Sequence, residues 1–234
     1  DLHIAYAKAD GDLANPATIE PPYDSNFSDK EWPNGWKDID PFESYRSLFN
    51  GTLGVFDNKE IIFSRAQNQG GQGIRQMVVH QLPSSAGGWN THGITLKQSD
   101  AYYMNEGTDC PGKDKEVGRG DGSERVKGYV GDNEHPNVDD YKPLAKGVSL
   151  QFANREPRFY ASVAYNGSIW NRRNETLPEN RNTQVFYYRG SGNGYTNTMF
   201  WLRTGIGIKK FVHPNDTNEK ETGNVDKIPS RPDP

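Results

Sequence analysis

The sequence predicts an α+β fold in which short antiparallel strands and a few short helices are joined by long irregular segments. Hydrophobic residues, with Tyr counted and Gly not, make up only 32% of the 234 residues. This is below the roughly 45–50% that is usual for globular domains, even allowing for the fact that the usual figure counts Gly and not Tyr. The 25 Gly and 15 Pro indicate many turns, because these residues interrupt regular structure. Aromatic residues reach 12%, which argues against a disordered chain, since disordered chains are poor in them. We therefore expect a loop-rich folded protein with aromatic anchors.

The N-terminal part is expected to contribute little regular structure. Residues 1–9 have the apolar spacing of the last turns of a helix. Residues 10–38 are rich in turn signals and are interpreted as one long ordered loop that carries Trp32 and Trp36. The chain starts inside a helical pattern and ends in a Pro-rich segment. We therefore expect residues 1–234 to be a single region excerpted from a longer protein.

The clearest helix in the sequence is predicted between Asp40 and Gly51. Asp40 suits the N-cap, because its carboxylate can accept the unpaired N–H groups of the first turn. Pro41 suits the first helical position, where no N–H is needed. Gly51 supplies a left-handed stop. The apolar residues recur at helical spacing and form one face: Phe42, Tyr45, Leu48 and Phe49.

Short runs of apolar and β-branched residues are predicted to be strands. They are residues 60–64, 74–82, 158–165, 185–188 and 206–212. Asn166-Gly167 marks a turn directly after one of these runs. Residues 67–73 and 83–92 are predicted to be loops, and residues 99–104 to form one or two helical turns.

Residues 105–147 are the least core-like part of the sequence. They are dense in Gly, Asp, Lys and Asn and contain few apolar residues, so we expect a surface insertion. The single cysteine, Cys110, lies in this stretch and has no partner in the chain for a disulfide. We expect it to be a free thiol in a loop.

Composition and motifs exclude several classes of function. The net charge of −4 leaves no basic field that would attract nucleic acid. No apolar run approaches the ~18 residues that a membrane-spanning helix needs. The sequence has no Gly-x-Ser-x-Gly motif for a nucleophilic serine and no His-Glu-x-x-His motif for zinc. No pair among the 31 acidic residues stands out as an acid/base couple. We therefore expect no enzyme activity, no cofactor and no metal site. Calcium binding by the acidic residues of the stretch 105–147, Asp109, Asp114, Asp121 and Asp132, stays open, although the EF-hand order is absent and solvated charge is the default interpretation.

Four segments, in order, carry a resemblance to a known family. The run Asn-Arg-Glu-Pro-Arg-Phe-Tyr-Ala-Ser-Val at residues 154–163, followed by Tyr-Asn-Gly at residues 165–167, resembles the "RDPRFYA…YNG" signature of the SusD/RagB family. Residues 45–49 together with 58–63, residues 100–107 and residues 204–212 resemble three further segments of that family. We expect the flanking helical repeats of the family, and its lipid-bearing cysteine, to lie outside this chain.

The resemblance implies a function as well as a fold. The complete family fold is mainly α, with this irregular region between its helical repeats. Family members bind oligosaccharides or polysaccharides on the outer face of the outer membrane and deliver them to a SusC-like TonB-dependent transporter. They are lipid-anchored and have no catalytic residues. By this resemblance, the chain would contact a membrane only through an anchor outside it and would bind no nucleic acid.

The residues themselves suggest where a sugar could bind. A sugar ring has an apolar C–H face that packs on a flat aromatic ring and a hydroxyl rim that bonds to polar groups. Aromatic residues on Gly-rich loops, with polar neighbours, meet this description. The candidate glycan-binding residues are Trp89, Asn90, His92, Trp32, Trp36 and Tyr195.

Other prominent residues are expected to be structural. Trp170 is predicted to be structural, Trp201 to lie in the core, and Arg155 and Arg158 to form structural pairs. Two other functions stay open. The region could serve only to contact the transporter, without a glycan site of its own, or it could be a glycoside hydrolase.

Overall fold

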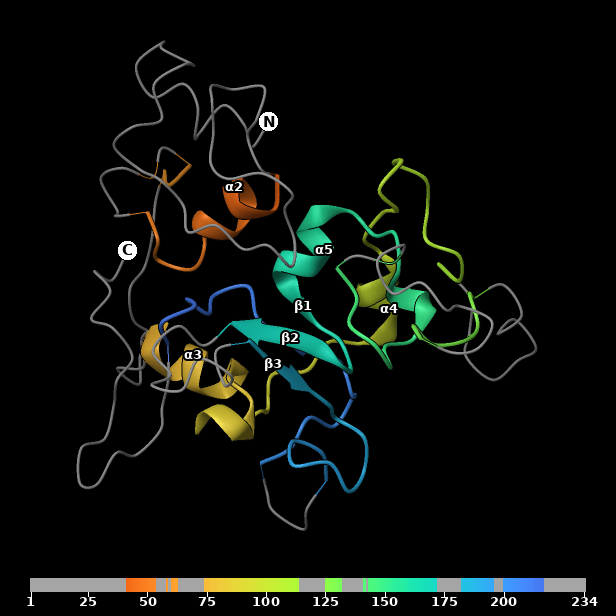
Figure 1. The fold of residues 1–234 in the computed structure, drawn as a ribbon. Coiled ribbons are helices and arrows are strands. Elements are labelled where there is room, and N and C mark those ends of the chain that lie inside the picture. The colour runs from red at the N-terminus through yellow and green to blue at the C-terminus, as the bar shows by residue number, and fades with distance from the viewer. Residues whose placement is uncertain are drawn as a thin grey trace.

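The structure is a computed structural model that describes residues 41–53, 58, 60–62, 74–113, 125–131, 141, 143–171, 182–195 and 200–216. The predictions for residues 1–38, including Trp32 and Trp36, and for the loop at residues 67–73 lie outside these residues. Short elements alternate with irregular chain (Figure 1), so the predicted α+β class is confirmed. The helices are α2 (Pro41–Ser47), α3 (Ile74–Gln81), η2 (Ser84–Ala86), α4 (Leu96–Asp100), η5 (Leu150–Phe152) and α5 (Pro157–Ser162). The strands are β1 (Val163–Ala164), β2 (Ser168–Asn171), β3 (Asn182–Val185) and β4 (Gly207–Ile208).

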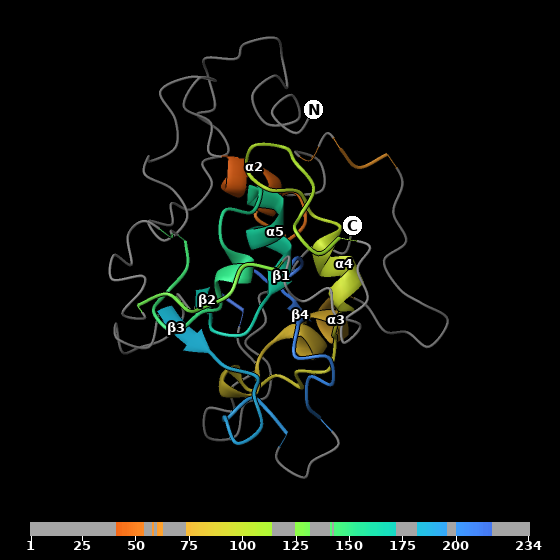
Figure 2. The same cartoon turned by 90° about the vertical axis from the view of Figure 1, so that its right-hand side faces the viewer.

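Helix α2 packs against α5, and the two lie side by side in both views (Figures 1 and 2). Phe42 and Tyr45 of α2 are buried in this contact. Glu43 and Arg46 are also buried, and they form an ion pair at 2.6 Å one turn apart. The predicted helix at residues 40–51 is confirmed, although the regular part ends at Ser47 and a turn continues it. Gly51 has the left-handed φ of 84° that the sequence predicts for a stop.

Two small antiparallel sheets follow α5. In the first, β1 pairs with β4 through Val163 opposite Ile208 and Ala164 opposite Gly207. In the second, β2 pairs with β3, from Ser168 opposite Val185 to Asn171 opposite Asn182. The predicted turn before β2 is confirmed. Gly167 adopts a φ of 84° there.

Two predicted strands are helices instead. Of the predicted strand at residues 74–82, all but Leu82 belongs to α3, because Val78, Val79 and the adjoining Leu82 lie at the spacing of one helical face and are all buried. Their β-branched character suggested a strand, but burial in a core overrides such a preference.

The predicted strand at residues 158–165 is α5 followed by β1. Pro157 occupies the first helical position, where its missing N–H costs nothing. Phe159, Tyr160, Ala161 and Ser162 are all buried. A short helix without a polar face shows no helical period, so its sequence alternation was misleading.

The remaining elements differ mainly in their limits. Residues 60–62 do not form the predicted strand: Ile61 N–H donates to Asn58 O at 3.2 Å in a turn, and Ile62 is 98% exposed. The helical turns predicted at residues 99–104 begin earlier, as α4, because the Thr95 side chain accepts a hydrogen bond from Gln98 N–H at 3.1 Å. The strand predicted at residues 185–188 is found earlier, because β3 ends at Val185. The strand predicted at residues 206–212 is shorter, because β4 contains only Gly207 and Ile208.

The buried apolar residues form two clusters. The larger one joins α2, α5 and β1 to the η5 segment, and its centre is a set of aromatic rings: Phe152, Phe159, Tyr160 and Tyr165. The smaller one lies between α3 and the β2–β3 sheet and contains Val78, Leu82, Trp170, Val185, Tyr187 and Leu202. Trp170 Nε1–H donates to the Tyr187 hydroxyl at 3.1 Å, so the prediction that Trp170 is structural is confirmed.

Some residues of the least core-like stretch reach the core. Val130 and Leu144 are buried in the larger cluster, and Cys110 is a free, buried thiol. A surface insertion at residues 105–147 stays a prediction, but Val130 and Leu144 attach described parts of this stretch to the larger cluster.

Both signature arginines are structural, as predicted. Arg155 is buried, donates to Ser99 O and Tyr102 O at 2.7 Å each, and lies 4.4 Å from the centre of the Phe159 ring. Arg158 donates from Nε to Glu156 Oε2 at 2.7 Å. Among the described residues, no helix has both the length and the apolar character to cross a membrane.

Candidate functional site

The loop that follows α3, residues 82–92, is fixed by its own backbone. A helix leaves its last carbonyl groups unpaired, and they need donors from elsewhere. Three successive N–H groups of the loop donate to them: Trp89 to Val79 O at 2.8 Å, Asn90 to Leu82 O at 3.0 Å and Thr91 to His80 O at 2.9 Å. The chain therefore turns back along the helix end, and Trp89 is held by the main chain on a rigid support.

Two residue types make this loop possible. A Cβ atom on Gly88 would overlap the backbone of Leu82, so the close approach requires glycine. Asn90 has a φ of 50°, a left-handed conformation that asparagine tolerates better than most side chains. The predicted loop at residues 83–92 is confirmed, with η2 as a short turn inside it.

A second loop, residues 186–195 after β3, is joined to the first by two asparagines. Ser85 N–H donates to Asn193 Oδ1 at 3.0 Å, and Asn90 Nδ2–H donates to Asn193 O at 2.6 Å. Both Asn90 and Asn193 are buried. The end of α3 and the loop after β3 accordingly lie next to each other in both views (Figures 1 and 2).

Aromatic residues from three segments meet over these loops. The rings of Trp89 and Phe200 stack at 5.1 Å with an interplanar angle of 26°. Trp89 also meets the His80 ring edge-to-face at 4.7 Å, and His80 stacks on His92 at 4.9 Å. Beside them, Tyr195 contacts Trp201 at 5.1 Å. We call this set the aromatic surface: His80, Trp89, His92, Tyr195, Phe200 and Trp201.

The aromatic surface is open to solvent. Trp89 is 37% exposed, Tyr195 39% and Phe200 43%. Trp201 is partly exposed, whereas its neighbour Leu202 is buried. The prediction that Trp201 lies in the core is therefore wrong. The reason is that Trp201 covers the Tyr195 ring at the surface, while Leu202 fills the smaller cluster below.

Polar groups border the exposed rings. His80 Nδ1 lies 2.5 Å from Thr91 Oγ1, which fixes the orientation of its ring. The pKa of His92 is lowered from its ordinary value of 6.5, first by burial and then by the neighbouring His80. His92 is therefore mostly neutral near pH 7, and a neutral imidazole can both donate and accept a hydrogen bond. The guanidinium groups of Arg189 and Arg203 lie over the rings of Tyr195 and Trp201, at 5.9 and 5.5 Å.

This arrangement suits binding better than catalysis. Exposed flat rings can hold an apolar face of a ligand, and the polar rim can bond to hydroxyl groups. The described residues that form the aromatic surface and its two loops include no carboxylate, and acid/base hydrolysis of a glycoside needs two. Within the described part of the chain, no three His, Cys, Asp or Glu residues are grouped to hold a metal ion.

Sequence reasoning located part of this site. Trp89, His92 and Tyr195 belong to the aromatic surface, whereas Asn90 is buried beneath it and joins the two loops. Trp32 and Trp36 lie outside the described residues. The residues not singled out from the sequence are His80, Asn193, Phe200, Arg189 and Arg203. Only Asn193, between two glycines, had a local signal of an unusual loop.

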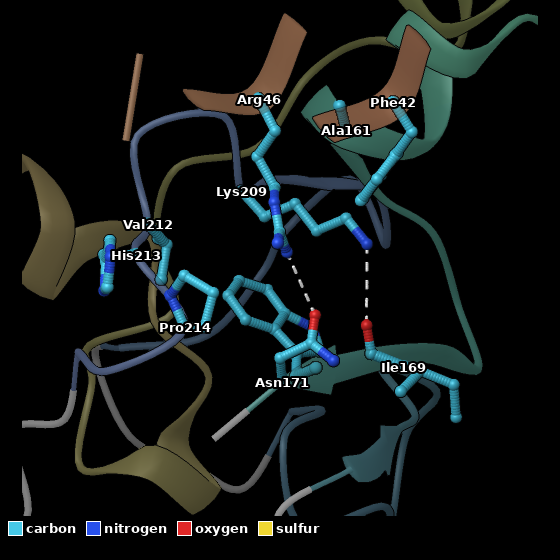
Figure 3. Close-up of a pocket in the computed structure, with 10 residues that line it drawn as sticks. Phe42, Arg46, Ala161, Ile169, Asn171, Lys209, Val212, His213 and Pro214 are labelled. Carbon is cyan, nitrogen blue, oxygen red and sulfur yellow. Dashed lines mark hydrogen bonds between the residues drawn. The ribbon is translucent and has the colours of Figure 1, made fainter. Parts of the chain in front are cut away.

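A separate small pocket lies between α2 and β2 (Figure 3). Arg46 Nη1–H donates across it to Asn171 Oδ1 at 3.2 Å, and Lys209 Nζ–H donates to Ile169 O at 3.5 Å. The space inside is about 20 Å³, enough for a water or two and too little for a sugar ring. We interpret it as a polar contact between packed elements.

A comparison with protein families identifies the fold. A model described as the SusD family matches residues 59–230, which is more than half of the chain and includes the whole aromatic surface. The chain belongs to the SusD family. The SusD family is generally one of non-catalytic glycan-binding proteins of the outer membrane that work with SusC-type transporters. No match was found among curated proteins or among solved structures.

Proposed function

We propose that this protein captures oligosaccharides or polysaccharides on its aromatic surface at the outer, cell-surface face of the outer membrane. It then delivers them, without cleaving them, to a SusC-like TonB-dependent transporter. Attachment to the membrane is through a lipid anchor outside this chain. The observation that carries the proposal is the exposed stack of Trp89 and Phe200 on a loop fixed by the end of α3.

The proposal has a physical basis in preorganisation. Ordering a mobile loop costs conformational entropy when a ligand binds. Here the main-chain hydrogen bonds to α3 and the contacts through Asn193 already order the loop. A sugar ring that stacks on Trp89 would then meet His92 and Tyr195 at its edge. Trp32 and Trp36 are proposed as further glycan contacts, on the grounds of the turn-rich sequence around them alone.

The direct test is a glycan panel measured by calorimetry with the 234-residue chain and its Trp89→Ala variant. We expect saturable binding to one class of glycan. Trp89→Ala should weaken it by about 1–3 kcal/mol, the scale of an aromatic residue at the centre of an interface. Tyr103→Ala is the matched control, because Tyr103 is 43% exposed but lies outside the aromatic surface. Equal affinities of wild type and Trp89→Ala would remove the aromatic surface from the glycan site.

Two measurements separate the alternatives. Chromatography of the incubated glycans should show no new reducing ends, and their release would instead support a hydrolase. Co-purification with a SusC-like transporter should succeed with both wild type and Trp89→Ala. If the transporter is retained while every glycan fails to bind to the folded chain, the region serves as a contact module only.

A further inference from the structure

Charge is distributed very unevenly along this chain. Residues 61–99 and 180–215 contain eight Lys or Arg residues and no Asp or Glu. The other 19 of the 27 basic residues share the rest of the chain with all 31 acidic residues, so these two segments carry +8 and the rest −12. All residues of the aromatic surface belong to these two segments. The folded chain thus combines its two acid-free segments at one place.

Two of these basic residues stand at the aromatic surface itself. Arg189 and Arg203 are exposed, and each lies over an exposed or partly exposed ring, of Tyr195 and of Trp201. In the described part of the chain, neither guanidinium takes part in a hydrogen bond or an ion pair. Stacking on a ring leaves the N–H edge of a guanidinium free to bind an anion.

Two other described basic residues of these segments, Lys209 and Lys210, serve different contacts. Lys209 Nζ–H donates to Ile169 O beside the small pocket, and Lys210 Nζ lies 3.7 Å from the centre of the Phe49 ring. Arg189 and Arg203 are the described basic residues of these segments whose side chains contact rings of the aromatic surface.

We propose that the glycan bound at the aromatic surface is acidic, with Arg189 and Arg203 binding its carboxylate or sulfate groups while Trp89 and Tyr195 stack on its rings. This inference rests on the proposed function and specifies its substrate class. Arg binds carboxylate and sulfate-like groups through paired N–H donors. The acidic remainder of the chain would repel such a ligand elsewhere, so charge also directs it to this surface.

The experiment compares glycans that differ only in charge. The carboxylate pair is an oligogalacturonate and its methyl ester, and the sulfate pair is an oligo-κ-carrageenan and its desulfated form. A wider set of neutral and acidic polysaccharides is screened beside them with the full 234-residue chain. Poly-glutamate serves as an anionic control that carries no sugar ring. Near-UV circular dichroism confirms that each variant is folded.

The expected result is that the tightest ligands are acidic and that binding weakens as salt is raised, because salt screens exposed charges. Arg189→Gln and Arg203→Gln should each weaken binding about five- to tenfold, as expected for the loss of one charge-assisted contact. Arg189→Lys and Arg203→Lys should recover part of the loss. The matched control is Arg158→Gln, since Arg158 is exposed but paired with Glu156. Trp89→Ala should weaken the same ligands, and poly-glutamate should bind poorly.

The outcomes separate this inference from the proposed function. If neutral glycans bind as tightly as acidic ones and depend on Trp89 but not on either arginine, the acidic class is wrong and glycan capture stands. If no glycan of either kind binds to the folded chain, the proposed function is wrong and this inference with it. Poly-glutamate binding as tightly as the sugars would reduce the effect to unspecific charge attraction and overturn the inference.

Discussion

Two stacks of aromatic rings in this chain have similar geometry and opposite access to solvent. In the larger core cluster, Phe159 and Tyr165 stack at 5.7 Å with an angle of 11° and are fully buried. At the aromatic surface, Trp89 and Phe200 stack at 5.1 Å with an angle of 26° and are more than one third exposed. Ring geometry alone would not tell which stack is structural. The supports differ: the buried stack is surrounded by α2, α5 and β1, whereas the exposed one rests on backbone hydrogen bonds.

The difference shows how a chain with little apolar content uses its aromatic residues. Burial of large rings supplies stability from few residues, and that is the task of Phe159 and its neighbours. Exposed rings add little to stability and are retained at binding surfaces. If this division is right, mutations in the two stacks should separate stability from binding.

The largest effect is expected from Phe159→Ala. This change opens a cavity in the larger cluster, and truncating a buried Phe typically lowers the free energy of unfolding by about 3–5 kcal/mol. Trp89→Ala, by comparison, should cost about 1 kcal/mol or less, as expected for a partly exposed residue. Urea unfolding followed by circular dichroism measures both values. Similar losses for the two variants would contradict the division between a structural and a binding stack.

A smaller effect is expected from Asn193→Ala, which removes the acceptor of Ser85 N–H between the two loops. Loss of one such hydrogen bond should lower the free energy of unfolding by about 1 kcal/mol. Because the loops carry Trp89 and Tyr195, glycan affinity should fall as well, although Asn193 is buried and makes no contact with a ligand in this proposal. Asn105→Ala, at an exposed position, is the control. A change in stability with unaltered affinity would show that the two loops act independently.

The smallest effect concerns pH. Burial and the neighbouring His80 hold the pKa of His92 below 6.5 in the folded protein, whereas the unfolded chain takes up this proton near pH 6.5. Below that pH the unfolded state binds more protons, so stability falls as pH decreases from 6.5 toward the folded-state pKa. Above pH 6.5 the group has no effect. Thermal unfolding at pH 7.5, 6.5 and 5.5 measures the trend, and His92→Gln should lose less stability over this range than wild type. Parallel curves for the two proteins would contradict the assignment.

The fold was predictable where local signals agree. Asp40, Pro41, the apolar spacing and Gly51 all indicate a helix at α2, and the turn at Asn166-Gly167 follows from its dipeptide. The two wrong strands have different causes. In α5, Phe159, Tyr160, Ala161 and Ser162 are all buried, so little polar face is left to reveal a helical period. In α3 one face is buried and the other is partly exposed, but the helix is too short for its partial alternation to be told from that of a strand. Pro157 was a local signal for a helix start that the alternation of residue sizes outweighed.

The part of the candidate site that could be predicted is the part that depends on residues close together in the sequence. The glycines before Trp89 indicate an exposed loop aromatic, and Trp89 is exposed as expected. Its partner Phe200 lies far away in the sequence, and no local motif near either residue predicts that the two rings stack. The same holds for Asn193, which meets Ser85 and Asn90 only because β3 returns beside the end of α3. Contacts between distant segments depend on topology, which the short sequence motifs do not contain.

The rate at which thiol reagents modify the buried Cys110 can measure local unfolding of the folded state. Its Sγ lies 3.9 Å from Asp100 Oδ1, and its pKa is raised chiefly by burial. Reagents that attack the thiolate should therefore modify it slowly, and the chain has no other thiol to compete. Cys110 is only 5% exposed and its neighbour Asp100 is bound by Arg125 at 2.8 Å, so we expect fast modification only when the segment around the thiol opens. The rate of modification of this single sulfur atom would then report how often the segment around Cys110 and Asp100 unfolds locally.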